Sequence, residues 1–462
     1  MLAIHTDSTS DHFTKKNHRH LMRRTPYILG TAAIGVPARA PSSSLALVKI
    51  IGNTSVFKDL KDPDYGWRSP VMLLVILSVA MQLCWSVWWN LMNNFAVVEL
   101  GFTGQEIGIQ QSIREIPGLL AVSIIVALWF FKEQPLAYIS LLILAGGIAV
   151  TGVFASEWGF YITTLIMSVG FHYFETLRQS LSLQWLPKAT AAYTMGRIMS
   201  ISAMVQLVTY GVVYLAWQTI KPSYEVAFAV SGIITILVVL VVAAVFPRFK
   251  EGVPQNKNLV LRKRYWLFYA LTFMGGARRQ IFTVFAGFLM VEKFGYHVHE
   301  VASLFIINGL INIFLAPRLG AFIGKVGERT ALTLEYIGLI GVFVSYAFVT
   351  NAYVAASLYV VDHAFFAMAI AIKTYFQKIA DPADIAPTSG VSFTINHIAA
   401  VFIPVLFGLL WLVSPAAVFL AGAGMAAISL GLARLLPQYP APGHELITGA
   451  ADKNAVLPAA AE

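Results

Sequence analysis

Twelve long apolar stretches dominate this chain and restrict what it can fold into. A membrane-spanning helix needs about 20 mostly apolar residues, and its backbone groups must be hydrogen-bonded within the helix because lipid offers no partners. The chain is 58% hydrophobic and 12% charged, whereas soluble domains carry about 25% charged residues. We therefore predict an all-α polytopic membrane protein with twelve transmembrane helices, at residues 70–98, 105–130, 135–154, 158–183, 190–217, 224–246, 265–291, 298–317, 330–350, 352–377, 385–412 and 415–436.

The second half of the chain repeats features of the first half at an offset of about 195 residues. The matching pairs fall in the same order at equivalent loops: Gly101 with Gly295, Glu106 with Glu300, Arg178 with Lys373, and Pro187 with Pro382. A repeat this long predicts two stacked modules rather than a solenoid, whose period is about 20–50 residues. In a membrane protein it favours a transporter with its site between the two modules.

The longest polar connection divides six helices from six. This gives five predicted parts: a poorly ordered basic tail at 1–66, a six-helix bundle at 67–246, a basic linker at 247–264, a second six-helix bundle at 265–436, and a flexible tail at 437–462.

Basic residues are distributed as a topology signal. The net charge is +9, but twelve Lys and Arg lie in loops on the N-terminal side of the membrane, against Lys221 and Lys293 on the other side. This bias predicts cytoplasmic N- and C-termini in a plasma (inner) membrane and no nucleic-acid partner.

Several chemistries lack the residues they need. Cys84 is the only cysteine, so no disulfide or cysteine-based metal centre can form within the chain. No nucleotide-binding loop of the Gly-x-x-x-x-Gly-Lys-Ser/Thr type is present. His297 and His299 are only weak evidence for metal binding. We expect no enzyme activity, no cofactor and no metal site.

The residues after the eighth predicted helix form the most specific local pattern. Gly320, Lys325, Gly327 and Arg329 match the pattern Gly-x-x-x-Asp-Arg/Lys-x-Gly-Arg-Lys/Arg, with Gly324 in place of the acidic residue. With the helix count and the repeat, this predicted loop resembles the major facilitator superfamily (MFS) of secondary transporters. The resemblance implies two pseudo-symmetric six-helix bundles, a cavity lined by the first, fourth, seventh and tenth helices, and a gating role for the loop.

Ionisable residues in the middle of predicted transmembrane helices are functional candidates, because charge at membrane depth is costly. Arg278, Arg279 and Gln280 lie half-way along the seventh helix. Adjacent helical side chains point about 100° apart, so at most one arginine can face a cavity squarely. A guanidinium can hold a carboxylate or phosphate through two hydrogen bonds; alternatively, either arginine pairs with an acidic residue on a neighbouring helix. The other predicted substrate-binding residues are Trp85, Asn90 and His363.

Proton-coupling candidates lie in the fourth and tenth helices. His172, Glu175 and Arg178 recur every three residues and share one helix face. Glu175 is a predicted proton carrier, or it only pairs with Arg178. Asp362 is the second predicted carrier, or the counter-ion of an arginine in the seventh helix. Arg178 and its repeat counterpart Lys373 are predicted gate residues.

Four further ionisable residues, Arg114, Glu115, Arg197 and His397, lie in the second, fifth and eleventh helices. These helices form the interface between halves in the resembled family, so we expect salt bridges or gates there. A lone His397 is more simply explained as a hydrogen-bonded packing residue.

The leading hypothesis is a secondary active transporter that works by alternating access. Its partners would be the lipid bilayer and a small solute, with an organic or inorganic anion preferred because of the seventh-helix arginines, and protons as the candidate coupling ion. The alternative is a non-transporting membrane receptor or assembly scaffold on the same fold. The corresponding first-half loop at 131–135 has almost lost the family pattern, which slightly favours that alternative.

Overall fold

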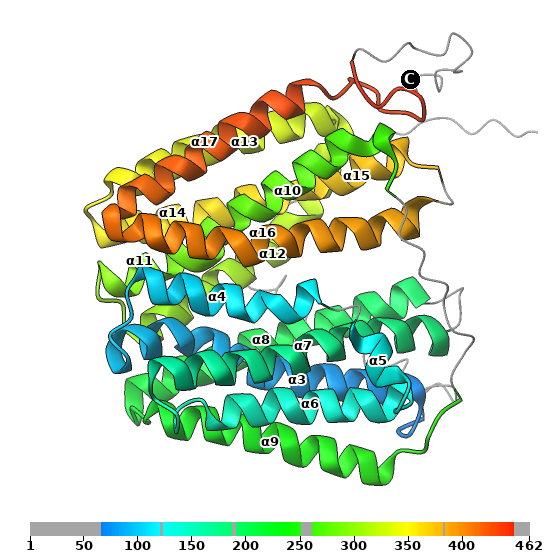
Figure 1. Cartoon of the computed structure of the whole chain (residues 1–462), viewed down its shortest axis with the longest axis vertical. Coiled ribbons are helices and arrows are strands. Elements are labelled where there is room, and N and C mark those ends of the chain that lie inside the picture. The colour runs from blue at the N-terminus through cyan, green and yellow to red at the C-terminus, as the bar shows by residue number, and fades with distance from the viewer. Residues whose placement is uncertain (1–65, 121–122, 187–190, 251–260, 382–383, 448–462) are drawn as a thin grey trace, which may run out of the picture. The chain divides into compact units, whose positions relative to one another are not determined.

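The computed structural model describes residues 66–120, 123–186, 191–250, 261–381 and 384–447 (Figure 1). Most of the predicted N-terminal tail, the middle of the predicted linker and the end of the predicted C-terminal tail lie outside these residues, as do Pro187 and Pro382. Within the described ranges the chain is almost entirely helical, which confirms the all-α fold class.

The first half of the described chain, residues 70–245, comprises α3 (Pro70–Asn94) with its π-helical extension η3 (Phe95–Glu99), α4 (Gly104–Leu119), α5 (Ile124–Leu128), α6 (Glu133–Val150), α7 (Glu157–Trp185), α8 (Ala191–Thr219) and α9 (Tyr224–Val245). The second half, residues 263–434, comprises η5 (Lys263–Tyr265), α10 (Trp266–Gln280), η6 (Ile281–Ala286), α11 (Gly287–Glu292), α12 (Val298–Val326), α13 (Glu328–Phe348), α14 (Ala352–Phe366), η7 (Ala367–Ala369), α15 (Ile370–Ile379), α16 (Ile385–Val413) and α17 (Pro415–Arg434).

Nine helical stretches of the described chain are long and apolar enough to cross a membrane. The other three predicted segments are also helical, as α4–α5, α7 and α10–α11. They contain several of the intramembrane charges, including Arg114, Glu115 and Arg279, and this lowers their hydropathy. The fold thus matches the predicted segments while concentrating polarity in three of them.

Serine side chains start several of these helices. Ser69, Ser156 and Ser223 precede α3, α7 and α9, and each side chain accepts a hydrogen bond from a backbone N–H in the first turn. Such a cap pairs a donor that has no partner within the helix and contributes about 1 kcal/mol. In α3 the cap is followed by Pro70, whose fixed φ suits the first helical position.

The repeat found in the sequence is also a structural repeat. Gly101 and Gly295 both adopt a left-handed conformation, with φ of 66° and 67°. Each is followed by a capping box: the backbone N–H of Thr103 donates to Glu106 Oε2 at 2.8 Å, and that of His297 donates to Glu300 Oε2 at 2.8 Å. Two equivalent turns therefore lead into α4 and α12.

Two helix pairs make the most extensive contacts between the halves. The helix α4 packs along α16 (Figure 1), and α8 packs against α12. The α4–α16 contact depends on small residues, since a Cβ at Gly108 would lie 3.1 Å from Gly408 Cα and closer still to the Pro404 carbonyl oxygen. Small residues let membrane helices approach closely and gain van der Waals contact.

Two predictions about local structure were wrong. The segment 105–130 is not one helix: α4 ends at Leu119, with Pro117 and Gly118 in its last turn, where proline lacks an N–H and glycine is a poor helix former. The predicted loop at 320–329 is mostly helical, because α12 continues to Val326 and only Gly327, at φ 80°, interrupts the helices.

Candidate functional site

The polar cluster that spans the two halves is built on four helices. Arg114 and Glu115 come from α4, His172 from α7, Arg279 from α10 and His397 from α16. We call these five residues the inter-half cluster. Arg114, Glu115, His172 and His397 are buried, with exposed fractions of 5–8%. Each charged residue at membrane depth costs about 2.5–3.5 kcal/mol on insertion scales, so the arrangement is expensive for a purely structural contact.

Glu115 is the centre of this cluster. One carboxylate oxygen forms a salt bridge with the Arg114 guanidinium, and the other lies 3.6 Å from His397 Nε2. Arg114 also donates from Nε to Gln111 Oε1 at 2.8 Å, and its guanidinium lies 5.2 Å from the centre of the Trp89 ring. The arginine is therefore positioned by an acid, an amide and an aromatic face together.

The two histidines lie next to each other across the interface. The ring centres of His172 and His397 are 5.4 Å apart. A Cβ added at Gly118 would meet the Nε2 atoms of both rings. Gly118 thus provides the space in which the histidines approach, and the Glu115 carboxylate completes a compact group whose ligand atoms all lie within 4.8 Å of one another.

The neighbouring arginines of α10 have different surroundings. Arg279 is half-buried and interacts electrostatically with Arg114, Glu115 and His397. Arg278 is buried inside the second half, with Nη2 3.5 Å from Glu335 Oε1 and the guanidinium 4.4 Å from the centre of the Tyr336 ring.

Arg278, Glu335 and Asp362 form a second-half cluster on α10, α13 and α14. Glu335 and Asp362 are 0% and 1% exposed, and Asp362 interacts electrostatically with both other members. Among the described residues, Asp362 Oδ2 has no hydrogen-bond partner. Two carboxylates are therefore grouped with one guanidinium inside the second half.

Aromatic side chains border the inter-half cluster on α3 and α7. The Trp85 ring stacks on Phe171 with centroids 4.1 Å apart and lies 6.0 Å from the Arg114 guanidinium carbon. Asn90 is completely buried, and neither polar atom of its side chain has a hydrogen-bond partner in the described part of the chain. Trp85 therefore lies beside the cluster, whereas Asn90 contributes unpaired polar atoms to the interior of the first half.

The remaining predicted substrate residues lie apart from the inter-half cluster. Gln280 is 1% exposed, and its Oε1 has no partner among the described atoms. His363 follows Asp362 on α14 and packs against Phe282, with ring centroids 4.7 Å apart. Both belong to the interior of the second half near Asp362 and Arg278.

The predicted proton carrier Glu175 and the predicted gate residues Arg178 and Lys373 lie on α7 and α15. Glu175 and Arg178 form the salt bridge that the sequence allowed, with Arg178 Nη2 2.7 Å from Glu175 Oε2. Lys373, the repeat counterpart of Arg178, is exposed on α15. Glu328, in the loop pattern, is buried and pairs with Lys378 Nζ at 2.7 Å.

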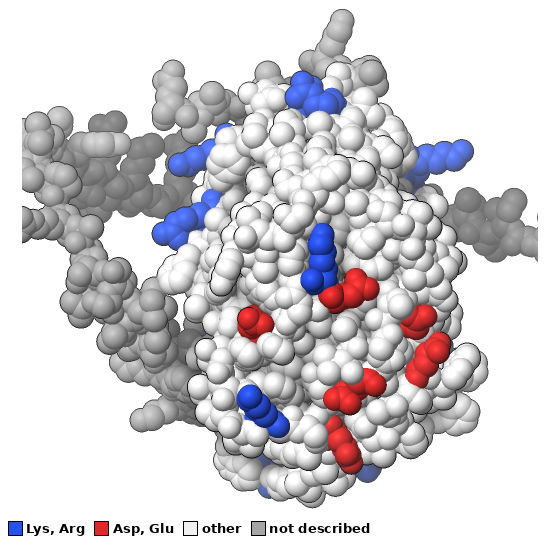
Figure 2. Space-filling model, turned by 90° about the vertical axis from the view of Figure 1, so that its left-hand side faces the viewer, with Lys and Arg blue, Asp and Glu red and all other residues white. Residues whose placement is uncertain are grey.

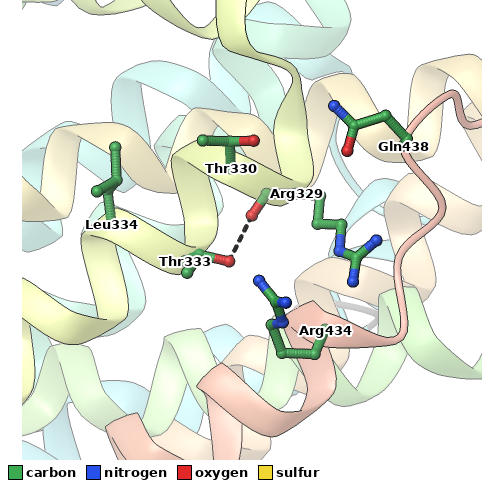
Figure 3. A pocket seen from close by; sticks show the side chains of 6 residues that line it. All are labelled: Arg329, Thr330, Thr333, Leu334, Arg434 and Gln438. Carbon is green, nitrogen blue, oxygen red and sulfur yellow. Dashed lines mark hydrogen bonds between the residues drawn. The ribbon is translucent and has the colours of Figure 1, made fainter.

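The basic residue at the end of the loop pattern faces a pocket. Arg329 lines a pocket at the ends of α13 and α17, opposite the guanidinium of Arg434 (Figure 3). The other lining residues are Thr330, Thr333, Leu334 and Gln438. The pocket shares no residue with the inter-half cluster, so we place the candidate site at the cluster, where both halves contribute charged groups.

Sequence reasoning missed Glu335 and underrated Arg114, Glu115 and His397. Glu335 is a single acid in the middle of the predicted helix 330–350, and the rule that intramembrane charge marks function would have found it. The grouping of Glu115 with His172 and His397 had no local signal, because the residues lie on three helices far apart in the sequence.

Comparisons with known proteins agree with this architecture. The model of a family described as Major Facilitator Superfamily matches residues 74–404. No curated protein matches the sequence. A mutant form of the nucleoside transporter NupG is similar in structure, with a TM-score of 0.66 and 18% identity over 79% of this chain and 99% of that chain.

Two further solved structures are similar at lower identity. A bacterial homologue of the human lysosomal transporter Spinster, in an inward-facing and occupied conformation, has a TM-score of 0.62 and 13% identity over 79% of this chain and 95% of that chain. An auto-inhibited POT family peptide transporter has a TM-score of 0.60 and 11% identity over 79% of this chain and 96% of that chain. At these identities the similarity concerns the fold.

Proposed function

Because the chain belongs to the Major Facilitator Superfamily, and is therefore an integral membrane transporter of a small solute, we propose that it is a secondary transporter whose substrate is a small anion. The observation that carries this proposal is the pair Arg114 and Arg279. The two arginines come from opposite halves, and both interact electrostatically with one carboxylate, Glu115. The excess positive charge favours an anion between the halves. Transport, rather than catalysis, is the activity.

The positions of the contacts between the two halves support an alternating-access mechanism. The α4–α16 contact joins Gly104 to Trp411 and Gly108 to Pro404, near the start of α4 and the end of α16. At the same end, Asn94 Nδ2 donates to the Tyr296 carbonyl oxygen at 2.7 Å. We propose that the bundles at 67–246 and 265–436 rock about the inter-half cluster, with this end closed in the present conformation.

The closed end is the proposed external face. Acidic side chains gather on the lower part of this face (Figure 2). Among the described residues at this end, the acidic ones are Glu99, Glu106, Glu157, Glu225, Glu292 and Glu300, and the basic ones are Lys221 and Lys293. Loops with few basic residues favour the outside, so both termini would be cytoplasmic and the membrane would be the plasma membrane.

Asp362 is the proposed proton carrier. It is buried, one carboxylate oxygen has no partner in the described structure, and it competes with Glu335 for Arg278. Glu175 is a weaker candidate because Arg178 already holds its carboxylate. In proteoliposomes, Asp362→Asn should abolish uptake driven by a pH gradient while retaining solute exchange, and the matched Glu175→Gln control should retain both activities.

The substrate class is tested by thermal unfolding of the purified protein with carboxylates, phosphate, sulfate, sugars, amino acids, nucleosides and organic cations. We expect one anion class to stabilise the protein, as a ligand that binds only the native state must, and Arg279→Gln to remove that effect. Arg318, exposed on α12, gives the matched control Arg318→Gln. Stabilisation by nucleosides or cations alone would refute the anion assignment. A folded protein that none of these solutes stabilises would favour the receptor or scaffold alternative.

A further inference from the structure

The hydrogen bonds of the two cluster histidines leave the same ring nitrogen free on each. His172 Nδ1 lies 3.0 Å from the Ser168 carbonyl oxygen, and His397 Nδ1 lies 2.9 Å from the Phe393 carbonyl oxygen. A carbonyl oxygen only accepts, so in each neutral ring Nδ1 carries the proton and Nε2 carries a lone pair. Histidines that bind metals are oriented in this way, by an N–H donated to a backbone carbonyl.

His397 Nε2 lies 3.6 Å from Glu115 Oε2, and His172 Nε2 and His397 Nε2 both lie beside Gly118. We propose that Glu115, His172 and His397 form a binding site for a divalent first-row transition-metal cation such as Zn²⁺. Two imidazoles and one carboxylate are a ligand set that suits this class of ion, with metal–ligand bonds of about 2.0–2.2 Å. The sequence offered no hint, because the ligands belong to α4, α7 and α16.

The spacing of the ligand atoms is close to what such an ion needs. Tetrahedral bonds of about 2.0–2.2 Å place neighbouring ligand atoms about 3.4 Å apart. His397 Nε2 and Glu115 Oε2 are already 3.6 Å apart, and the full set lies within 4.8 Å. Small side-chain rotations would therefore complete the site without moving a helix.

The nearby arginines oppose a cation, but they also shape the site. Arg114 pairs with Glu115 Oε1, which leaves Oε2 for the metal, and a hydrogen-bonded carboxylate is the usual ligand arrangement. Arg114 keeps Gln111 and the Trp89 ring as further partners. Three protein ligands leave a fourth position open, and an anion or hydroxide bound there would offset the charge of Arg279.

Such an ion would connect the two halves directly. Glu115 and His172 belong to the first half, whereas His397 belongs to the second. Any motion that separates α4 from α16 would remove one ligand. Bound metal should therefore stabilise the conformation in which these helices pack together, whatever solute the protein transports.

The test uses tag-free, full-length protein stripped with a chelator and titrated with Co²⁺, whose visible absorption reports four-coordinate binding, and with Zn²⁺ by calorimetry. We expect one ion per chain. His172→Gln and His397→Gln should each weaken binding more than tenfold. The matched controls are His363→Gln, a histidine outside the cluster, and the double variant His297→Gln/His299→Gln; both should bind as the wild type does.

A replacement ligand separates lost binding from lost folding. His397→Cys supplies a thiolate and should retain Co²⁺ while adding a sulfur-to-metal charge-transfer band; Cys84 is buried and should give no such band in the wild type. The proposal is overturned if the folded wild type binds no Co²⁺. It is equally overturned if His172→Gln and His397→Gln bind normally, or if binding depends on His297 and His299.

Discussion

Adjacent side chains on one helix can belong to different parts of a membrane protein. Arg278 and Arg279 are neighbours, yet the first is 4% exposed against Glu335 and Tyr336 while the second is half-buried beside the inter-half cluster. The angle of about 100° between consecutive helical residues produces this separation. The roles of Arg278 and Arg279 therefore have to be assigned separately, although the two residues are adjacent.

The Arg278–Glu335 pair gives a stability prediction. Arg278→Leu leaves a buried carboxylate without its partner and should destabilise the protein by about 3–5 kcal/mol. The double variant Arg278→Leu/Glu335→Leu should recover most of that loss, because apolar residues can replace a buried ion pair at little cost. Chemical unfolding in detergent measures both. Additive losses in the double variant would show that the two residues do not interact.

The corresponding change at Arg279 should behave differently. Arg279→Leu removes a half-buried charge and should lower stability by no more than about 1 kcal/mol, as expected for partly exposed charges, while abolishing anion-dependent stabilisation. A loss of stability as large as that of Arg278→Leu would mean that Arg279 is a structural residue.

Asp384, at the start of α16, provides a pH-dependent contact outside the membrane-spanning segments. A hydrogen bond from Arg262 Nη2 at 2.8 Å holds the pKa of the Asp384 carboxyl below its ordinary value. A lowered carboxyl pKa adds stability above the ordinary value, and this is lost as pH falls through the lowered one. Wild type should therefore lose its advantage over Asp384→Asn below about pH 4. A constant difference at lower pH would contradict this.

At the scale of elements, the feature that the two halves repeat is the turn before α4 and before α12. Gly101 and Gly295 take the same left-handed conformation before the same kind of capping box, although the flanking residues differ. A Cβ in this conformation is strained by about 1–2 kcal/mol. Equivalent glycines thus preserve the chain reversal between the first two helices of each half.

Substituting these glycines should destabilise both halves alike. Gly101→Ala and Gly295→Ala should each cost about 1–2 kcal/mol through backbone strain alone, because no atom lies within 4 Å of the added Cβ. Gly146→Ala, in helix α6 and also in open space, is the control and should be neutral or stabilising by up to about 1 kcal/mol. Thermal unfolding in detergent compares the three. Equal effects at all three positions would exclude a role for the left-handed turn.

At the scale of the whole molecule, function depends on which end of the protein is closed and on which side of the membrane it lies. Gly104, Gly108 and Trp411 form close contacts between α4 and α16 at the end that is proposed to be closed. At this end the described acidic side chains outnumber the basic ones, and several of them gather on one face (Figure 2). The closed end and the proposed outside are therefore the same end.

Labelling of single cysteines tests this orientation. Cys84→Ala removes the only cysteine, which is fully buried. In that background Tyr353→Cys, at a position 83% exposed, should react with a membrane-impermeant maleimide added to intact cells. Lys250→Cys, exposed at the opposite end, should react only after the cells are opened. The reverse pattern would place the termini outside.

The sequence by itself determined the helical membrane architecture, the twelve apolar segments and the repeat. These features are encoded locally: apolar length sets a membrane helix, and glycine with a capping residue sets each turn. The exceptions are the segment 105–130, where α4 ends at Leu119, and the loop pattern around Gly320, where α12 continues to Val326.

The tertiary structure decided which charges meet. Glu115, His172 and His397 come together only because α4, α7 and α16 pack at one point, and the packing around α10 decides which partners Arg278 and Arg279 each meet. Contacts between side chains of distant helices depend on how each helix is rotated about its axis and on the depth of each side chain in the membrane. The hydropathy of the sequence does not determine either. For that reason the candidate site was only partly predictable: the seventh-helix arginines were found, whereas the grouping of the inter-half cluster required the fold.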